Sequence, residues 1–405
     1  MSSAEGTLPA VFDARPTSSG DELNAIRRPG PELSQTQGAA LMIVKDTVQA
    51  RYKSIGLRRL SVAVALTQLL AREKSPRLGR AAAQIGKARP AEATTNTHLI
   101  DMPATQAQKT VLITGCSAGG IGDALALEFH ARGKSRLRVI ATARRLEAMA
   151  GLAAAGITTL VLDVTDADSI ARVKEEVTKI TGGTLDILVN NAGQPHLCPA
   201  IDVELAGAKA VFDANFWGPV QTVQAFAPLL IAAAQSRGRG AWGARIVNVG
   251  STAAIAPVPF SAVYNASKGA LHSFSDTLRV ELAPFNVKVT SVIAGGVDTN
   301  ISKPSSLPPA SLYRPLEAIY QAKRANTTGG TMAPRTFARD VVSDALARSP
   351  RAWLWAGYMA WAIWLLSTFG GRRVFDGMIS KRFGVSDFAA MVKSGEAPVV
   401  KPKAP

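Results

Sequence analysis

The sequence predicts an α/β protein built on a doubly wound parallel sheet. Short apolar runs rich in Val, Ile, Leu and Thr begin near residues 110, 138, 158, 186, 244 and 288, with helix-like segments between them. A glycine-rich turn follows the first run directly. Strands that alternate with helices in this way form a parallel sheet covered by helices on both faces.

Composition limits the kinds of partner. The 405-residue chain is 47% apolar, which suits a sizeable core, and its two cysteines favour a reducing compartment over a disulfide framework. The net charge of +16 gathers on the flanks: residues 51–89 hold ten Lys or Arg and one acid, and residues 300–405 hold fifteen and six. Because no metal-ligand spacing or nucleic-acid recognition motif accompanies these charges, we expect neither a metal ion nor nucleic acid.

We divide the chain into three parts. Residues 1–105 begin with a stretch rich in Ser, Gly, Pro and Thr, show no signal-peptide pattern and predict a low-complexity, largely disordered extension. Residues 106–356 form the α/β domain, and residues 357–405 form an apolar and basic tail. Met102 closely precedes the first strand, so one hypothesis is that the working protein begins there.

The first predicted strand, 110–114, ends in a glycine-rich turn, and a helix is expected over 123–132. The turn reads Thr114-Gly115-Cys116-Ser117-Ala118-Gly119-Gly120-Ile121-Gly122. Strand, glycine-rich turn and helix in succession are the context of a dinucleotide site, because glycines admit a pyrophosphate and the helix N-terminus supplies N–H donors. A plain tight turn is the alternative. The expected cofactor contacts are Gly115, Ser117, Gly120 and Ile121.

The second predicted strand, 138–143, ends in Arg144 and Arg145. An acid at this point would bind the ribose hydroxyls of NAD, whereas arginine can pair with a 2′-phosphate. We therefore expect NADP(H), with Arg144 as the first candidate. Two solvated arginines that open a helix are the alternative.

The third and fourth predicted strands, 158–162 and 186–189, end in polar residues at the same edge of the sheet. Asp163 either accepts a hydrogen bond from the adenine amino group or starts the helix expected over 166–180. Val164 follows Asp163, and Asn190, Asn191 and Ala192 stand at the end of the fourth strand.

Tyr264 and Lys268 lie four residues apart in a predicted helix, so that both side chains point to the same face. A tyrosine phenol titrates near ~10, and a nearby ammonium lowers that pKa toward the range useful for proton transfer. The pair could therefore transfer protons if it lies in a pocket, although many helices carry this spacing by chance.

Taken together, the motifs resemble those of the short-chain dehydrogenase/reductases in order and approximate spacing, over about residues 108–350. They are the glycine-rich turn, Asp163-Val164, Asn190-Asn191-Ala192-Gly193 and Tyr264-x-x-x-Lys268. The resemblance implies a Rossmann fold and an NADP-dependent oxidoreductase acting on CH–OH and C=O groups. It also implies that Asp163, Val164, Asn190, Asn191 and Ala192 bind the cofactor. One extra residue separates Gly115 from Gly120, which leaves open which glycine faces the pyrophosphate.

The resemblance also implies roles in catalysis. Ser251, which follows the predicted strand 244–249, would bind the carbonyl oxygen, and Tyr264 would donate the proton. Lys268 would hold the ribose and lower the pKa of the phenol, while Asn215 would complete the proton relay. The alternatives are that Ser251 only caps a turn and that Asn215 is a buried residue at a helix kink.

The segment after the sixth predicted strand, 288–293, would complete the site. Val297 and Thr299 would touch the nicotinamide, and Ala294, where the family usually has proline, indicates a looser loop. Four prolines make residues 301–332 irregular, and the family implies a mobile substrate lid here. The basic residues of this segment suit an anionic substrate or a solvated face; they are Lys303, Arg314, Lys323 and Arg324.

Residues 352–371 are uncharged and include four tryptophans. Twenty residues at ~1.5 Å each could just span a ~30 Å bilayer core. If residues 353–355 form the family's seventh strand, however, only about 357–369 remain, and basic residues follow. We therefore expect attachment to a membrane surface. A spanning helix and a dimer interface, which would make a homo-oligomer, are the alternatives.

The turn, the tail and Lys381-Arg382-Phe383-Gly384 resemble the fungal NADPH-dependent 1-acyldihydroxyacetone-phosphate reductase group. This resemblance implies a lipid ketone substrate and an intracellular protein on the endoplasmic reticulum or lipid droplets, with its catalytic domain in the cytosol. Two alternatives remain. The first is a ketoreductase of fungal secondary metabolism, acting on a polyketide or terpenoid ketone. The second is a non-catalytic NADP(H)-binding protein that docks a partner.

Overall fold

The computed structural model describes residues 108–133, 136–236, 242–299, 306–325, 330–371 and 373–397. The expected N-terminal extension lies outside these residues, so the three-part division of the chain stays a prediction.

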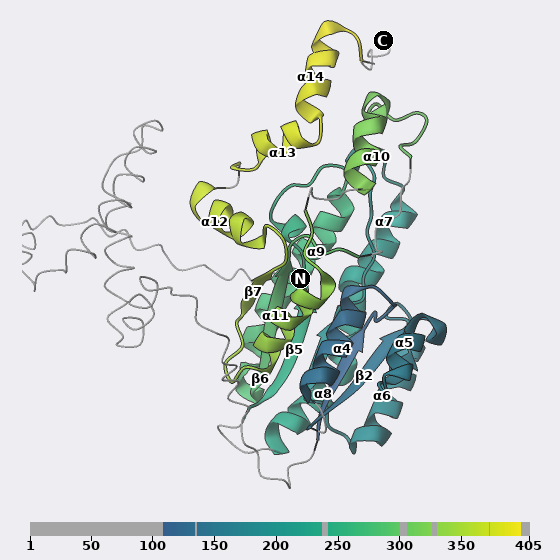
Figure 1. Ribbon diagram of the computed structural model, residues 1–405, viewed down its shortest axis with the longest axis vertical. Helices are drawn as coiled ribbons and strands as arrows, with labels where there is room; N and C mark the ends of the chain where they lie inside the picture. The colour runs from purple at the N-terminus through teal and green to yellow at the C-terminus, as the bar shows by residue number, and fades with distance from the viewer. Residues whose placement is uncertain are drawn as a thin grey trace, which may run out of the picture. The chain divides into compact units, whose positions relative to one another are not determined.

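Seven parallel strands form one sheet in the order β3-β2-β1-β4-β5-β6-β7 (Figure 1), which confirms the doubly wound Rossmann fold. Parallel pairing brings the carboxyl ends of the strands to one edge, and the strand order reverses between β1 and β4, the place where such sheets bind ligands. The strands are β1 (Lys109–Thr114), β2 (Leu137–Ala143), β3 (Thr158–Val161), β4 (Ile187–Asn190), β5 (Ala244–Val249), β6 (Val287–Ala294) and β7 (Trp353–Ala356).

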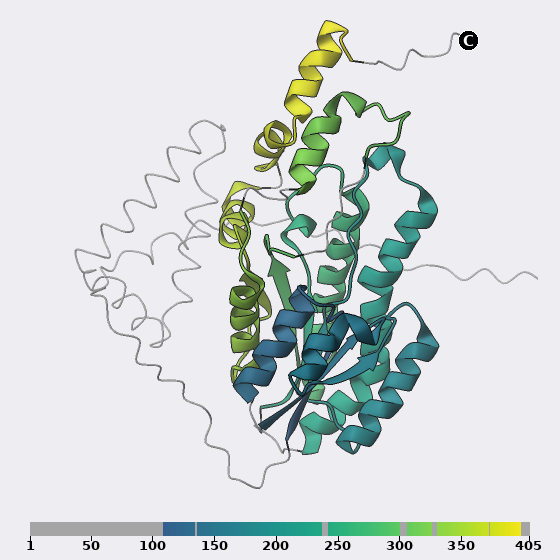
Figure 2. The ribbon, with the colours of Figure 1, turned by 45° about the vertical axis from the view of Figure 1, so that its right-hand side comes forward.

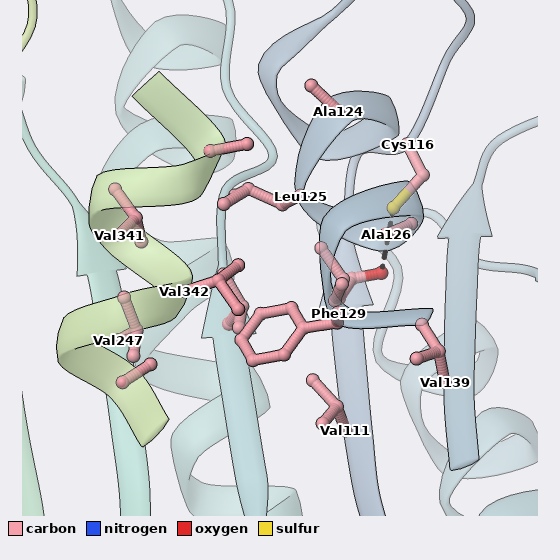
Figure 3. Packing of buried hydrophobic residues seen from close by; sticks show 14 of the residues in the cluster. Val111, Cys116, Ala124, Leu125, Ala126, Phe129, Val139, Val247, Val341 and Val342 are labelled. Atoms are coloured by element: carbon pink, nitrogen blue, oxygen red, sulfur yellow. Dashed lines mark hydrogen bonds between the residues drawn. The ribbon is translucent and has the colours of Figure 1, made fainter. Parts of the chain in front are cut away.

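A layer of helices covers each face of the sheet (Figures 1 and 2). One layer consists of α4 (Ile121–Gly133), α5 (Ala150–Ala154) and α11 (Pro334–Leu346). The other consists of α6 (Ala167–Thr181), α8 (Gly218–Ser236) and α9 (Ala262–Glu281). In Figure 3 the ring of Phe129 points from α4 toward Val342 of α11, and both side chains are fully buried. The core of this layer therefore packs together a helix from near the start of the domain's sequence and a helix from near its end.

Helix α6 shows how the sequence sets its bounds. Asp166 is the N-cap, and its carboxylate accepts a hydrogen bond from the backbone N–H of Asp168 at 2.9 Å. Gly182 ends the helix at a left-handed φ of +68°, a conformation that glycine adopts without steric penalty. Ile170, Val173 and Val177 recur at helical spacing and are all buried. Short connecting elements are η3 (Leu146–Met149), η4 (Ala200–Asp202), α7 (Leu205–Phe212), η5 (Asp213–Trp217), η6 (Thr252–Ala254) and η7 (Ala283–Phe285).

The expected seventh strand forms: β7 pairs in parallel with β6. Strand formation removes residues 353–356 from the apolar run, and a short apolar helix follows. The helices of the tail are α12 (Ala360–Gly370), α13 (Asp376–Arg382) and α14 (Val385–Ser394). Within the described part of the chain, no helix combines the length and apolar character needed to cross a membrane.

Part of the segment between β6 and α11 is helical, where the sequence predicted an irregular chain. A 3₁₀ turn, η8 (Arg314–Leu316), leads into α10 (Glu317–Ala325). Pro315 lies in the first turn of η8. Backbone N–H groups of a first turn have no acceptor within the helix, so a proline, which lacks this N–H, breaks no hydrogen bond there. The prediction of an irregular chain was wrong for residues 314–325, because Pro315 stands at a position that a helical turn tolerates.

Candidate active site

A cavity of about 580 Å³ lies at the carboxyl ends of the strands, within the ~300–1,000 Å³ that ligand pockets occupy. Most of the residues predicted from the sequence line it. They are Gly115, Ser117, Gly120, Ile121, Arg144, Asp163, Val164, Asn191, Ala192, Ser251, Tyr264, Lys268, Val297 and Thr299. Arg145, Asn190 and Asn215 are not among its lining residues.

Gly119 absorbs the extra residue of the glycine-rich turn. Its φ of +73° is left-handed, and its N–H donates to the Asp123 carboxylate at 3.1 Å. The N–H of Gly120 donates to the carbonyl of Ser117 at 3.1 Å and closes the turn. Gly115 and Gly120 line the cavity and Gly119 does not, so the first two are the candidates for contact with a bound cofactor.

The ends of β1 and β4 are bound together beneath the cavity. The side-chain amide of Asn191 donates to the carbonyl oxygens of Thr114 and Gly115 at 2.9 and 3.0 Å. The hydroxyl of Thr114 accepts from the backbone N–H groups of Asn191 and Ala192, both at 3.0 Å. A Cβ on Gly115 would lie 2.7 Å from the Cα of Ala192, so the backbones can approach this closely only with glycine at this position.

Arg144 follows β2 and lines the cavity, whereas Arg145 is the residue before η3. The N–H of Ala118 in the glycine-rich turn donates to the carbonyl of Ala148 in η3 at 2.9 Å. This bond ties the turn to the chain that follows the two arginines. Arg144 therefore lies at the cavity, and Arg145 lies outside its lining. The sequence, in which the two are neighbours, did not show this difference in position.

Asp163 and Val164 follow β3 and line the same cavity as Arg144. One carboxylate oxygen of Asp163 accepts from the N–H and the hydroxyl of Thr165, at 2.9 and 2.7 Å. The N-cap of α6 is Asp166, so Asp163 does not start that helix.

Ser251, Tyr264 and Lys268 line one cavity, as their predicted roles require. Ser251 forms a side-chain hydrogen bond with the Tyr264 phenol. The Lys268 ammonium lies 6.0 Å from the Tyr264 ring centroid and donates to the carbonyl of Val249 at 2.9 Å. Helical pitch places Tyr264 and Lys268 on one face, and the end of β5 supplies Ser251.

Burial raises the pKa of the Tyr264 phenol, and its hydrogen bond with Ser251 acts in the opposite direction. Burial also lowers the pKa of Lys268, to about 8. The pKa of the phenol is thus raised in this structure because desolvation of the phenolate is the largest effect, and the lowering expected from Lys268 stays a prediction. A phenol that keeps its proton at neutral pH is in the right form to donate it.

Asn215 is fully buried in η5, which is π-helical and interrupts the helices on either side. Its side-chain oxygen accepts from the N–H of Gln194 at 2.8 Å, and its amide donates to the carbonyl of Gln194 and the hydroxyl of Ser267, both at 3.0 Å. A Cβ on Gly193 would lie 2.9 Å from Asn215 and 3.5 Å from the Lys268 ammonium. Asn215 thus holds the chain beside the cavity against α9, and it also sits at a helix irregularity.

The loop after β6 carries Val297 and Thr299 and is held by two β-bridges. Val297 pairs with Met332, and the N–H of Met332 donates to the carbonyl of Gly296 at 3.0 Å. Gly296 and Tyr358 exchange two backbone hydrogen bonds of 3.1 Å. These bridges hold Gly296 and Val297 against neighbouring segments, and the looseness expected from Ala294 stays a prediction.

Comparison with known proteins agrees with this geometry. A family described as short chain dehydrogenase matches residues 109–309. Short-chain dehydrogenase virD of Hypocrea virens is 41% identical over 284 residues, which cover 69% of this chain and 94% of its own. The chain belongs to the short-chain dehydrogenase family.

Other relatives of this family are similar over the same region. The NADPH-dependent 1-acyldihydroxyacetone phosphate reductase of Schizosaccharomyces pombe is 43% identical over 272 residues, 63% of this chain and 88% of its own. A solved short-chain dehydrogenase from Streptomyces avermitilis aligns with a TM-score of 0.55 and 26% identity, over 72% of this chain and 98% of its own.

As a short-chain dehydrogenase, the protein is an NAD(P)-dependent oxidoreductase acting on CH–OH and C=O groups. The site fits such a cofactor, because Gly115 and Gly120 line a cavity that the N-terminus of α4 adjoins. Among the described residues, no group of three His, Cys, Asp or Glu side chains could hold a metal ion.

His272 was not predicted as a site residue, yet it supports the site by accepting a hydrogen bond from Ser251. It lies one helical turn after Lys268 on α9, and its Nε2 accepts a hydrogen bond from the backbone N–H of Ser251 at 3.2 Å. A Cβ on Gly250 would lie 2.0 Å from that nitrogen. The spacing of four from Lys268 was the only signal in the sequence.

Asn190 also has a role that its motif did not indicate. Its side-chain amide donates to the side-chain oxygen of Asn248 at 2.9 Å, and its side-chain oxygen accepts from the hydroxyl of Thr222 at 2.8 Å. Asn248 in turn donates to the hydroxyl of Ser275 at 2.8 Å. These buried residues join β4, β5 and two helices beneath the site, so Asn190 organises the sheet instead of lining the cavity.

Proposed function

We propose that the protein is an NADPH-dependent carbonyl reductase that converts a ketone to a secondary alcohol. The supporting observation is the gathering of Ser251, Tyr264 and Lys268 on one cavity with the glycine-rich turn and Arg144. Bound NADPH would supply the hydride to the carbonyl carbon. Ser251 would hydrogen-bond the carbonyl oxygen, Tyr264 would give that oxygen its proton, and Lys268 would hold the ribose.

Preference for NADPH over NADH rests on Arg144. The residue lies at the end of β2, is exposed, and lines the cavity. A guanidinium can form bidentate, charge-assisted hydrogen bonds with a 2′-phosphate, and no acid follows β2 directly to bind ribose hydroxyls in its place. The similarity to an NADPH-dependent relative supports the same choice.

The proposed substrate is a lipid-like ketone such as 1-acyldihydroxyacetone phosphate. Support comes from the 43% identity with the S. pombe reductase of that name and from the basic residues of segment 301–332. Of these residues, only Arg314 has a described side chain. Its guanidinium lies 3.0 Å from the Glu317 carboxylate and donates to the carbonyl of Leu307 at 3.1 Å.

The engagement of Arg314 favours a second candidate, a neutral polyketide or terpenoid ketone of fungal secondary metabolism. A substrate phosphate would have to compete with Glu317 for this guanidinium. A neutral ketone would leave the ion pair intact.

One experiment separates the two candidates. NADPH oxidation is measured with an acyl dihydroxyacetone phosphate and with its dephosphorylated analogue. If the site binds the phosphate, losing that charged contact should lower kcat/KM by roughly 10- to 100-fold. Equal efficiency with both compounds would reject the phosphate and favour the neutral ketone.

The Tyr264→Phe variant tests the reductase mechanism itself. Removal of the phenol hydroxyl should abolish turnover of either ketone and leave NADPH binding intact, because the hydroxyl supplies the proton. Normal turnover by this variant would refute the assigned mechanism. Absence of ketone turnover in the wild type, with tight NADPH binding, would instead favour the non-catalytic, partner-docking alternative.

We also propose that the tail attaches the protein to an intracellular lipid surface, on the endoplasmic reticulum or lipid droplets, with the catalytic domain in the cytosol. Support comes from α12, where Trp361, Trp364, Leu365 and Phe369 recur at helical spacing and are 67%, 44%, 42% and 69% exposed. Basic residues follow in α13 and its approach, namely Arg373, Lys381 and Arg382. An apolar face beside basic residues suits an anionic membrane surface.

A further inference from the structure

Phe260 joins the start of α9 to the lid, a name we use for residues 306–325. It stands four residues before Tyr264. Its ring meets the rings of Tyr313 and Tyr320 edge to face, each at 5.5 Å between centroids. Its φ of +61° is left-handed, which is strained for a bulky side chain and requires support from the surrounding packing.

Hydrogen bonds connect the same lid to the chain beside the cavity. The hydroxyl of Tyr320 donates to the carbonyl of Leu197 at 2.9 Å. The N–H of Cys198 donates to the carbonyl of Phe260 at 2.8 Å. Leu197 and Cys198 follow Gln194, which lines the cavity. The lid therefore contacts the segment that follows Gln194 and, through Phe260, the segment that precedes Tyr264.

The outer side of the lid packs against the C-terminal helices α13 and α14. The ring of Phe388 lies 5.4 Å from that of Tyr313, and Phe383 packs on the same apolar cluster. Between the two helices, Gly384 has a φ of +72°, and a Cβ there would lie 2.7 Å from the side chain of Ile319. The left-handed conformation favours glycine at this position.

We propose that α13 and α14 form a brace that holds the lid against Phe260 and thereby sets the affinity for the ketone substrate. Phe388 is its central positioning residue, acting through Tyr313. The tail thus has a role in substrate binding that is separate from the exposed face of α12. This inference rests on the proposed reductase function, because substrate affinity is its main consequence.

Steady-state kinetics of Phe388→Ala with saturating NADPH test the brace. The KM for the ketone should rise about 3- to 10-fold, the scale of one lost aromatic contact, with kcat within about twofold of the wild type. Phe388→Leu, which keeps apolar volume against the lid, should restore most of the affinity. Phe285→Ala is the matched control, because Phe285 is 44% exposed in η7, before the amino end of β6.

A double-mutant cycle with Tyr313→Ala identifies the contact that carries the effect. If the brace acts through Tyr313, Phe388→Ala should raise the KM little further once Tyr313 is already alanine. Fully additive effects, or an unchanged KM in Phe388→Ala, would overturn the proposal.

Amide hydrogen exchange tests the brace without any turnover. Exchange of residues 306–325 should be faster in Phe388→Ala than in the wild type or Phe285→Ala, because the lid loses its outer support. Unchanged exchange in the lid would overturn the brace. If the wild type reduces no ketone, the proposed function fails, and the exchange result still decides the brace.

Discussion

The backbone N–H of Ser251 donates a hydrogen bond to Nε2 of His272 at 3.2 Å, in the interior beneath the candidate active site. Burial, and then the charge of Lys268, lower the pKa of His272 to about 4, while Asp276 acts in the opposite direction. The ring is therefore neutral at physiological pH and can accept this bond. Trp353 of β7 packs against it, with 5.7 Å between ring centroids.

Replacement of His272 by leucine should lower kcat/KM about tenfold or more, because a buried N–H left without an acceptor costs ~1–3 kcal/mol and Ser251 is free to shift. His272→Gln can still offer an oxygen to that N–H and should retain most of the activity. The measurement is ketone reduction at saturating NADPH. Equal losses in the two variants would show that the acceptor does not position Ser251.

Acid should destabilise the protein through the same histidine. Its folded pKa of about 4 lies below the ordinary ~6.5, so the unfolded chain binds more protons between these values. The stability contribution is present above pH ~6.5 and is lost as the pH falls toward 4, by an amount on the order of a few kcal/mol. Urea unfolding at pH 7.5 and 4.5 should show a smaller difference for His272→Gln, and an equal difference would contradict the assignment.

The two arginines after β2 should differ in their effect on the cofactor. Arg144→Asp should reverse or remove a preference for NADPH over NADH, because its side chain lines the cavity. Arg145→Asp makes the same change in charge one residue further along, outside the lining, and should leave most of the preference in place. Fluorescence titration with both cofactors measures this. Equal affinity of the wild type for NADPH and NADH would reject the assignment of NADP(H).

Binding of NADPH should weaken above pH 8. The pKa of Lys268 is about 8 because the ammonium is buried, so its charge is lost as the pH rises through this value. If the ammonium holds the ribose, the Kd should rise up to about tenfold between pH 7 and 9. Lys268→Met, which has no proton to lose, should bind more weakly with a flat profile. A sloping profile in Lys268→Met would assign the pH dependence to another group.

The exposed face of α12 should be needed for attachment to lipid. A triple variant with Trp361, Trp364 and Phe369 replaced by serine should no longer co-sediment with anionic phospholipid vesicles. Its reduction of ketones in solution should be unchanged, since these side chains are exposed and lie away from the core. Phe285→Ser controls for loss of an exposed ring elsewhere. Retained vesicle binding would reject the lipid-surface proposal. A lower mass by sedimentation analysis, with vesicle binding unaffected, would assign the face to a second copy of the chain.

Most of the fold followed from local patterns. Parallel strands bring their carboxyl ends to one edge, so residues placed at strand ends by the sequence had to come together there. Ser251 and Asp163 are two of these. In the same way, helical pitch was sufficient to place Tyr264 and Lys268 on one face, because it depends only on spacing along the chain.

Tertiary packing decided what spacing could not. Adjacent residues have different positions in the folded chain. Arg144 lines the cavity and Arg145 does not. Asn191 donates hydrogen bonds to the glycine-rich turn, whereas Asn190 belongs to a buried hydrogen-bond network. His272 became an acceptor because β5 passes beside α9, a meeting of segments distant in sequence. The sequence by itself determined the sheet, the order of the motifs and the catalytic face of α9, since these depend on near neighbours. Which atoms finally meet depended on contacts between distant segments, and only the folded chain brings those together.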